Sequence, residues 1–445
     1  MVDPSTALAA FVWLGGATPD SEVRLDAPRH RPTPPLRLRA PLPAPDDGPA
    51  DRRRVFVEVV DFDAPVHASA RRDTWGLGTL RRGTILPARR GYPASGCSGW
   101  AALPDGGGVC DGDGVTLVGE PGAPGALTLE PDLGEALPYR YAKVVAPGTP
   151  RLARLPTPAE LLELRAGELP TGLPHVRTEG VVFVALDKPY AVDGEVFVRT
   201  LEGDYIAHDQ LVPVTPPVTM GQPLVEATLP VAFVVADDAP LFSRGEADDT
   251  GKAGDTLIVA GIAERTARFP VTAQPSIGDQ PYLEGPGGRL VRRADARLAQ
   301  ARRRPSGVGP HEKWIHVDLD EQVLVAYEGD RPVFVTLVST GKAGYDTPAG
   351  HYRLRRKFVS RRMTGPDPDT GTYDIAEVPW AMYYKGGYAL HGAYWHDEFG
   401  QVRSHGCTNL PPPAARWLFR WSAPEIPTGW HARFEAGTRI VFTRH

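Results

Sequence analysis

The sequence has few cysteines, no long apolar runs and no net positive charge. Its 445 residues include 3 cysteines and 4 methionines. No window approaches the roughly 18 apolar residues that a membrane-spanning helix needs. The apolar run at residues 7–14 has no Lys or Arg before it, so no signal peptide is evident in the given chain. A formal net charge of −5 argues against nucleic acid as the main partner.

Proline and glycine are abundant, with 47 and 48 residues. That density suits short strands and tight turns more than long helices. A chain of this length is also too long for a single hydrophobic core. We therefore expect a mainly β protein of several domains.

Changes in composition along the chain indicate where these domains lie. The proline-rich residues 1–50 predict an extended tether. Residues 51–175 and 176–298 hold short strand-like runs between turn signals. We expect small SH3-like barrels in the second range, with chance hairpins as the alternative. Residues 299–310, basic and then Gly- and Pro-rich, predict a linker, and residues 311–445 predict a β-rich domain of ordinary size.

Several elements can be predicted from their residues alone. The runs "KWIHVDL", "QVLVAYEG" and "PVFVTLVS", within residues 313–339, predict strands, and "EGDR" predicts the turn between the last two. The run "PPPAARWLFRWS", residues 411–422, predicts a short helix entered by proline. The run "TPAELLELRAG", residues 157–167, predicts a helix with Thr157 as N-cap and Glu160 completing a capping box.

The three cysteines divide into a pair and a single residue. Cys97 and Cys110 lie close together in a Gly-rich stretch, whereas Cys407 follows roughly 300 residues later. This pattern is typical of one disulfide plus one reactive cysteine. A disulfide indicates an oxidising compartment, and two reduced, half-buried thiols are the alternative.

Residues 389–410, "ALHGAYWHDEFGQVRSHGCTNL", hold Cys407 among three histidines. A free thiol needs an adjacent base to attack as thiolate, and His391 and His405 are the candidates. A strand–loop–strand structure places His391 better to face the thiol, which leaves His405 to line the site. Gly406 has no Cβ, so a carbonyl could approach the backbone N–H groups of Gly406 and Cys407 as in an oxyanion hole.

A zinc site is the rival interpretation of this stretch. His391, His396, His405, Cys407 and Asp397 could supply nitrogen, sulfur and oxygen ligands. The spacing matches neither C-x-x-C nor H-E-x-x-H, so we expect no metal and no other cofactor. We expect His396 and Asp397 to form a solvated pair in a loop.

Aromatic and sulfur-containing side chains precede this stretch. Tyr384 and Met382 alternate along a predicted strand, which could place them in a substrate groove. Packing in the core is the alternative. The basic run "RRKFVSRR", residues 355–362, would fit an acidic partner, although charge runs usually form a solvated face.

The motifs resemble those of a known family. "HG" followed after eleven residues by "SHGCTN", together with "STG" and "TPAG" upstream, is similar to the signature of the L,D-transpeptidases, the YkuD-type catalytic domain. The resemblance covers residues 311–443, under a third of the chain. It implies a catalytic domain of β-sandwich or β-barrel type.

The resemblance also implies roles for individual residues. Cys407 would be the nucleophile and His391 the general base. Gly392 would orient the base. Ser404, His405 and Gly406 would shape the site and its oxyanion hole, and Asn409 would contact substrate.

The reaction that the resemblance implies takes place on peptidoglycan stem tetrapeptides. The cysteine forms a thioester at the third residue and releases D-Ala, and an amine of another stem completes a 3-3 cross-link. An L,D-carboxypeptidase, a lipoprotein-attaching or -releasing enzyme and a non-catalytic wall-binding scaffold are the alternatives. The expected location is the periplasm or cell envelope, with peptidoglycan as partner, wall binding by the N-terminal modules, and carbapenems acylating the cysteine.

Overall fold

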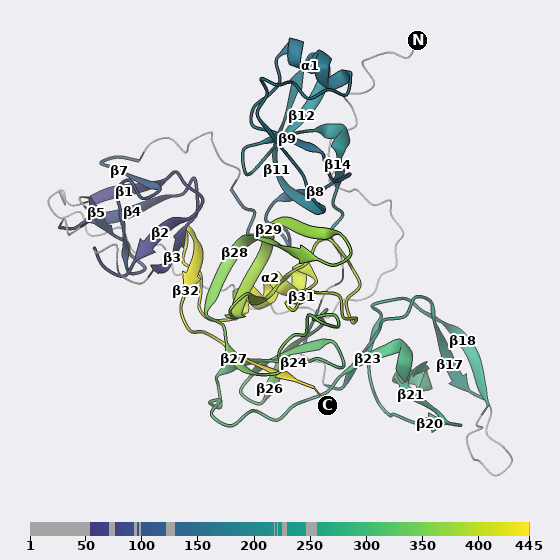
Figure 1. Ribbon diagram of the computed structural model, residues 1–445. Coiled ribbons are helices and arrows are strands. Elements are labelled where there is room, and N and C mark those ends of the chain that lie inside the picture. Colours follow the sequence, from purple (N-terminus) through teal and green to yellow (C-terminus); the bar gives the residue numbers. More distant parts are fainter. Residues whose placement is uncertain are drawn as a thin grey trace, which may run out of the picture. The chain divides into compact units, whose positions relative to one another are not determined.

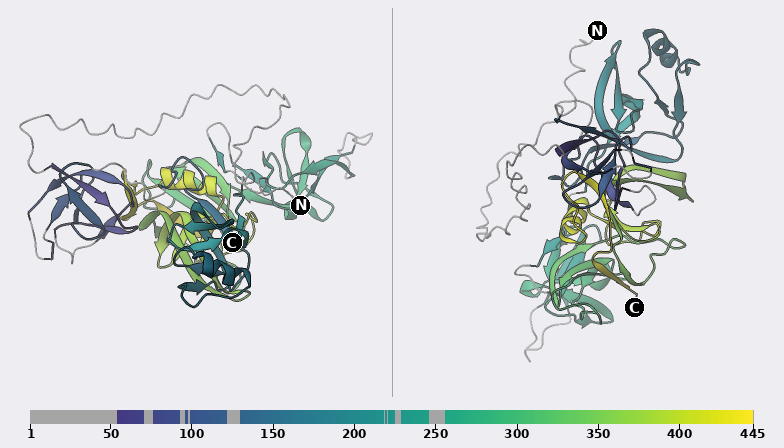
Figure 2. Two further views of the ribbon diagram at one scale, coloured as in Figure 1. Left: turned by 90° about the horizontal axis from the view of Figure 1, so that it is seen from above. Right: turned by 90° about the vertical axis from the view of Figure 1, so that its left-hand side faces the viewer.

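A computed structural model describes residues 54–444, apart from residues 71–75, 93–95, 98, 122–129, 218, 220, 225–228 and 246–255. All described residues belong to the unit Arg53–His445, and the predicted tether at residues 1–50 lies outside them. The expectation of a mainly β fold is confirmed, since strands far outnumber the two α-helices of the described part (Figures 1 and 2). Neither of these helices is long and apolar enough to cross a membrane.

The first group of strands surrounds a small apolar core. Alternate residues of the first strand, Val55, Val57 and Val59, are buried, as expected for a strand with one face on a core. Cys97 and Cys110 are joined as a disulfide, with Cα atoms 5.5 Å apart. The strands are β1 (Arg54–Val59), β2 (Ala64–His67), β3 (Gly76–Leu80), β4 (Ile85–Arg90), β5 (Trp100–Ala102), β6 (Gly108–Cys110) and β7 (Val115–Val118).

A second group of strands crosses the boundary that composition placed at residue 175. β8 pairs with β11 and β14, and β9 pairs with β10, so residues 140–165 belong with residues 181–213. The predicted capping box of Thr157 and Glu160 is present at α1. The elements are β8 (Arg140–Val144), β9 (Pro150–Leu152), α1 (Pro158–Arg165), β10 (His175–Arg177), β11 (Val181–Val192), β12 (Glu195–Thr200), β13 (Tyr205–Ala207) and β14 (Leu211–Pro213).

A third group forms two small sheets of three and five strands. Their shared core includes Ala232, Val234, Leu283 and Leu298. That they are SH3-like remains a prediction. The strands are β16 (Val231–Val234), β17 (Ala239–Arg244), β18 (Leu257–Ala263), β19 (Arg268–Pro270), β20 (Ser276–Ile277), β21 (Gln280–Glu284), β22 (Leu290–Arg292) and β23 (Ala296–Ala299).

The C-terminal segment contains the predicted strands and helix. One sheet has the order β15-β26-β25-β24-β33-β27, and the other runs through β28, β29, β30 and β31. The predicted helix is α2, whose buried face includes Leu418 and Phe419. The elements are β15 (Gln222–Pro223), β24 (Lys313–Asp318), β25 (Val323–Glu328), β26 (Arg331–Leu337), β27 (Gly350–Arg353), β28 (Arg356–Asp367), β29 (Gly371–Lys385), β30 (Tyr388–Gly392), β31 (Thr408–Leu410), α2 (Pro412–Trp421), β32 (Trp430–Phe434) and β33 (Arg439–Thr443).

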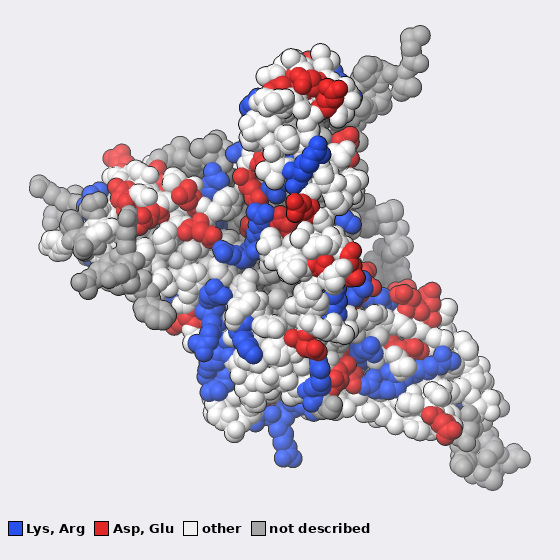
Figure 3. All heavy atoms as spheres, in the orientation of Figure 1, with Lys and Arg blue, Asp and Glu red and all other residues white. Residues whose placement is uncertain are grey.

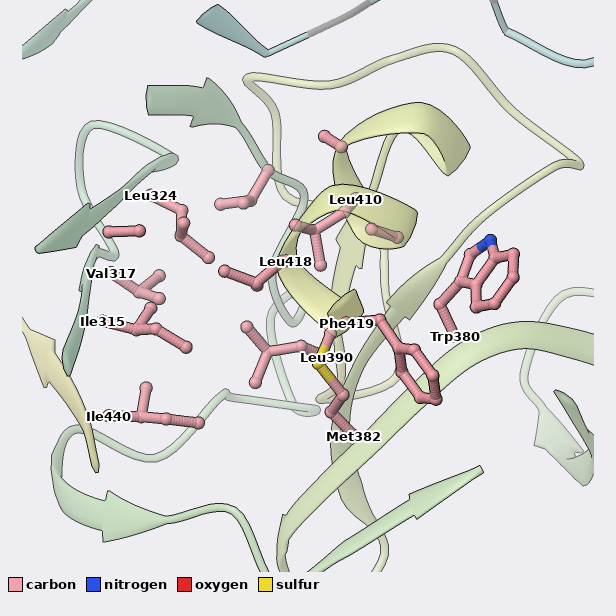
Figure 4. Close-up of a cluster of buried hydrophobic side chains, with 14 of the residues drawn as sticks. Ile315, Val317, Leu324, Trp380, Met382, Leu390, Leu410, Leu418, Phe419 and Ile440 are labelled. Carbon is pink, nitrogen blue, oxygen red and sulfur yellow. The ribbon is translucent and has the colours of Figure 1, made fainter. Parts of the chain in front are cut away.

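The largest apolar core lies between these elements. β24 and β25 contribute Ile315 and Leu324, and the second sheet contributes Met382 and Leu390 (Figure 4). Leu418 of α2 packs against the same cluster. This core supports the two short strands that carry the candidate site, β30 and β31.

Strands from earlier in the chain extend the sheets of the C-terminal segment. β15 pairs with β26, β11 pairs in parallel with β29, and β32 pairs with both β3 and β28. The predicted linker forms no helix or strand after Ala299, and its Val308 is buried in a core cluster. The C-terminal segment therefore shares its hydrogen bonding with the strands before it.

Candidate active site

Cys407 lies in a tight turn just before β31. The preceding residue, Gly406, has φ of +110°, which residues with a side chain rarely adopt. A Cβ on Gly406 would also lie 2.8 Å from the ring of Tyr388. Glycine is therefore required for the turn that presents the thiol.

Two hydroxyl groups hold this turn in place. The Oγ of Ser404 accepts a hydrogen bond from the N–H of Gly406 at 3.1 Å and donates one to the carbonyl of Cys407. The Oγ1 of Thr347 donates to the carbonyl of Gly406 at 2.7 Å and accepts from the N–H of Gly341 at 2.9 Å. Ser404 and Thr347 thus both fix the turn; a site-shaping role was predicted for Ser404 and stays a prediction, and the sequence assigned no role to Thr347.

The N–H of Gly406 has a different partner from the one predicted. It is already bonded to Ser404, so it could join an oxyanion hole only after giving up that hydrogen bond. Such a donor must point at the place where negative charge develops. An oxyanion hole at His405, Gly406 and Cys407 stays a prediction.

The surroundings of the half-buried Cys407 thiol favour its protonated form. Burial raises the pKa of this thiol to about 11, although a hydrogen bond with the backbone of Ala389 acts in the opposite direction. Its sulfur donates a hydrogen bond to the carbonyl of Gly387, at 3.6 Å. A nucleophilic cysteine attacks as the thiolate, so the predicted role of Cys407 requires a base that removes its proton.

His391 is a neutral imidazole in the core-facing strand β30. Burial lowers the pKa of His391 to about 4, which the carbonyl of Gly392 only partly offsets. The ring Nδ1 donates to that carbonyl at 3.3 Å, as expected from the sequence for Gly392. The proton is thereby assigned to Nδ1, which leaves Nε2 as the proton acceptor.

The register of two strands brings the turn that holds Cys407 next to the strand that holds His391. β30 and β31 are parallel, with His391 opposite Asn409. Leu390 is opposite Thr408, the residue after Cys407, and the Cys407 thiol has a hydrogen bond with the backbone of Ala389 on β30. The turn that holds Cys407 therefore adjoins β30, and the roles of His391 and Cys407 as base and nucleophile stay a prediction.

His405 contacts an acidic side chain and two aromatic rings. Its Nε2 lies 2.8 Å from a carboxylate oxygen of Asp367, at the end of β28. Its ring stacks on Tyr373 and meets Tyr345 edge-on. Burial opposes ionisation of Asp367, but hydrogen bonds from Thr370 and Asp369 hold its pKa at about 2. His405 is thus committed to a carboxylate partner.

Asn409 has a partner that the sequence did not reveal. Its side-chain Nδ2 donates to the Nε2 of His396 at 2.9 Å. Burial, with help from Arg403, lowers the pKa of His396 to about 4, so that imidazole is neutral and accepts. The expectation of a solvated pair of His396 and Asp397 is wrong for His396, because the chain folds back and places His396 against Asn409.

Met382 and Tyr384 occupy core positions. Met382 is fully buried, and the Oγ of Ser422 lies 3.6 Å from its sulfur. The Tyr384 ring packs against Tyr352 and Phe442. Substrate contact at Met382 or Tyr384 stays a prediction that their burial does not favour.

The zinc grouping considered from the sequence is not assembled. His405 faces Asp367, and His396 faces Asn409. Among the described residues, one group of side chains lies close enough to share a metal: His67, Cys110 and Asp113. Its cysteine is already bonded in the disulfide with Cys97.

The basic run at residues 355–362 is largely satisfied within the protein. Arg361 pairs with Asp63, and Arg362 pairs with Asp374. Lys357 is almost completely buried, and its ammonium donates to the carbonyls of Phe419 and Ser422. Figure 3 shows both basic and acidic side chains on this face of the molecule. An acidic partner of the run stays a prediction.

Comparisons with known proteins concern mainly the C-terminal segment. Residues 312–441 match the family model YkuD, the L,D-transpeptidase catalytic domain, so the resemblance found in the sequence is confirmed. A search of curated proteins gave no match.

Three solved structures illustrate the similarity. A cysteine-to-serine mutant of the Enterococcus faecium L,D-transpeptidase is 24% identical over 30% of this chain and 50% of its own, with a TM-score of 0.25. The catalytic domain of the E. faecium enzyme is 26% identical over 30% of this chain and 98% of its own, with the same TM-score of 0.25. An L,D-transpeptidase from Mycobacterium smegmatis is 18% identical over 60% of this chain and 95% of its own, also with a TM-score of 0.25. The matched part thus spans half the length of the first of these proteins.

Proposed function

We propose that this protein is a peptidoglycan L,D-transpeptidase in which Cys407 is the nucleophile and His391 the general base. The observation that supports the proposal is the pairing of β30 with β31 within the family-matched segment, which brings His391, bonded through Nδ1 to the carbonyl of Gly392, next to the turn that holds Cys407. A thiol paired with a positioned base is the arrangement that cysteine acyl transfer requires.

The proposed acylation moves one proton and exchanges one bond. As the sulfur of Cys407 attacks the carbonyl carbon of the third stem residue, Nε2 of His391 takes the thiol proton. Loop backbone N–H groups stabilise the oxygen that becomes negative. The bond to the terminal D-Ala then breaks, and His391 returns the proton to the departing amine.

Deacylation reverses these roles with a second amine. The amine of a neighbouring stem attacks the thioester carbonyl and gives a proton to His391. The sulfur leaves and is reprotonated, and the two stems are joined by a 3-3 cross-link. Water in place of the amine would give a carboxypeptidase with the same two residues.

The location of the protein follows from this proposal. Peptidoglycan cross-linking takes place outside the cytoplasm, in the periplasm or cell envelope. A disulfide such as the one between Cys97 and Cys110 is also typical of oxidising compartments. Wall binding by the N-terminal strands is part of the proposal, and the titration of the protein against isolated cell wall would test it.

The proposal is tested with disaccharide tetrapeptide and mass spectrometry. The protein and its Cys407→Ala variant are incubated separately with this substrate. Cross-linked dimer with loss of D-Ala, absent with the variant, is the expected result. Tripeptide alone would indicate a carboxypeptidase. No product that depends on Cys407 would contradict an L,D-peptidyl transfer and favour the lipoprotein-directed or scaffold alternatives.

A second measurement detects acylation without an acceptor. One solved structure is described as the E. faecium catalytic domain acylated by ertapenem. We expect ertapenem to add its mass to this protein and not to Cys407→Ala.

A further inference from the structure

The loop that follows His391 returns to the site at His396. Ala393 opens the loop by donating its N–H to the carbonyl of Leu410 at 2.9 Å, directly after the pairing of β30 with β31. The ring of Trp395 then lies 5.7 Å from that of His391. The next residue, His396, accepts the hydrogen bond from the Asn409 amide. Two neighbouring side chains of the loop therefore contact the base and the residue opposite it.

The far end of the loop is held by residues from a separate part of the chain. Arg297 of β23 donates through Nε to the carbonyl of Gly400 at 2.9 Å. Arg265 donates to the carbonyl of Asp397 at 3.3 Å. Phe399 lies in the same apolar cluster as Val235, which follows β16. The third group of strands thus supports the loop that carries His396.

Without its hydrogen bond to His396, the side chain of Asn409 could interact with His391. Its backbone is bonded to Ser339 on one side, with N–H···O distances of 2.8 and 2.9 Å, and its strand pairs with β30 on the other. Its side chain shares the face of its strand partner His391, and an amide NH2 is a strong donor. An Asn409 amide that turned toward His391 would compete with the thiol for the lone pair of Nε2.

We infer that His396 is a positioning residue for the proposed reaction: it holds the Asn409 amide away from His391, and Arg297 holds the loop that carries His396. This inference rests on the proposed function, because it concerns the base of that reaction. It assigns a contribution to the active site to residues of β23, which lies outside the segment that matches the family.

The test follows acylation of the full chain by ertapenem, measured by mass spectrometry over time and over ertapenem concentration. His396→Ala should lower the maximal acylation rate by up to about 100-fold, the cost of misplacing a reacting group by about 1 Å. The half-saturating concentration should change little, because His396 acts on the base. His396→Gln, whose amide oxygen can accept from Asn409, should recover most of the rate. His351→Ala, at an exposed position on β27, is the matched control.

A double-mutant cycle separates positioning from general packing. If His396 acts through Asn409, His396→Ala should slow the Asn409→Ala protein little further. Arg297→Ala should lower the rate in the same direction, with the exposed Arg303→Ala as control and thermal melting as a check of folding.

Each result decides between the two proposals. An unmodified wild-type protein would overturn the proposed function and this inference with it. A wild type that is acylated, with His396→Ala equally fast, would overturn the inference alone. So would a His396→Gln variant as slow as His396→Ala, or an equal cost of His396→Ala with and without Asn409.

Discussion

The lowered pKa of His391 makes the pH profile of acylation a sharp test of the mechanism. A base is active only when it is unprotonated, so the rate should fall where His391 takes up a proton. Burial lowers the pKa of His391 from 6.5 to about 4. We therefore expect the acid limb of ertapenem acylation near pH 4, about 2.5 pH units below the position for an ordinary histidine.

A buried and an ordinary histidine differ strongly in their neutral fraction at pH 5.5. At pH 5.5 a base with a pKa of about 4 is about 97% neutral, whereas one with a pKa of about 6.5 is about 9% neutral. The acylation rate at pH 5.5 should therefore nearly equal that at pH 7.5. A tenfold drop over this interval would refute a buried, neutral His391 as the base.

The burial of His391 also makes the stability of the fold depend on pH, so the pH profile of acylation needs a control for unfolding. Because the folded-state pKa is depressed, the neutral ring contributes its full stability above pH 6.5, and this contribution is lost as the pH falls toward about 4. The shift corresponds to about 3 kcal/mol. Tryptophan fluorescence must therefore show a folded protein at each pH, so that loss of acylation is not mistaken for acid unfolding.

Two further predictions concern buried positions near the site. Gly406→Ala should lower the rate of ertapenem acylation at least about tenfold and the free energy of unfolding by about 1–3 kcal/mol, because Gly406 has a positive φ and a Cβ there would meet the Tyr388 ring. Gly119→Ala is the control, because a Cβ on Gly119 would lie in open space. Equal effects of the two substitutions would contradict the argument. Lys357→Ala should lower the free energy of unfolding in urea by about 3 kcal/mol through the cavity it leaves, and Lys357→Met much less, because Met fills the space without a buried amine. A Met variant as unstable as the Ala variant would show that the hydrogen bonds of the amine dominate.

The local sequence pattern predicted strands and helix ends that depend only on neighbouring residues. The alternation in residues 313–339 gave the strands of one sheet, and Thr157 with Glu160 marked the start of α1. The pairing of the strand that holds His391 with the strand that follows Cys407 was also accessible, because it needed only a strand, a loop and a strand in sequence.

The partners of the site residues were not accessible in this way. His405 meets Asp367 and Asn409 meets His396 because a hairpin end and a loop return to the site. Such contacts depend on how strands pair and how loops fold back, which the local alternation of residues does not encode. The grouping of β8 with β11 was missed for the same reason.

Residues 312–441, which match the family, bury some of their aromatic side chains against residues from earlier in the chain. Trp430, Tyr394 and Phe399 all lie within it and are almost completely buried. Trp430 packs in the core of the first strand group, Tyr394 lies 4.1 Å from the ring of Tyr141, and Phe399 shares a cluster with residues around β16. The segment therefore depends on earlier residues for three of its aromatic side chains.

That dependence predicts that residues 311–445 alone are unstable. Burial of a large apolar side chain contributes about 2 kcal/mol, so exposing three would cost about 6 kcal/mol. A whole domain is stable by only about 5–15 kcal/mol. Residues 311–445 and 54–445 can be expressed side by side and compared by thermal melting, gel filtration and ertapenem acylation. We expect the shorter chain to melt far lower or to aggregate. If it melted and reacted like the longer chain, the earlier strands would be attachments, and the contacts of Trp430, Tyr394 and Phe399 would contribute little to the folding of the site.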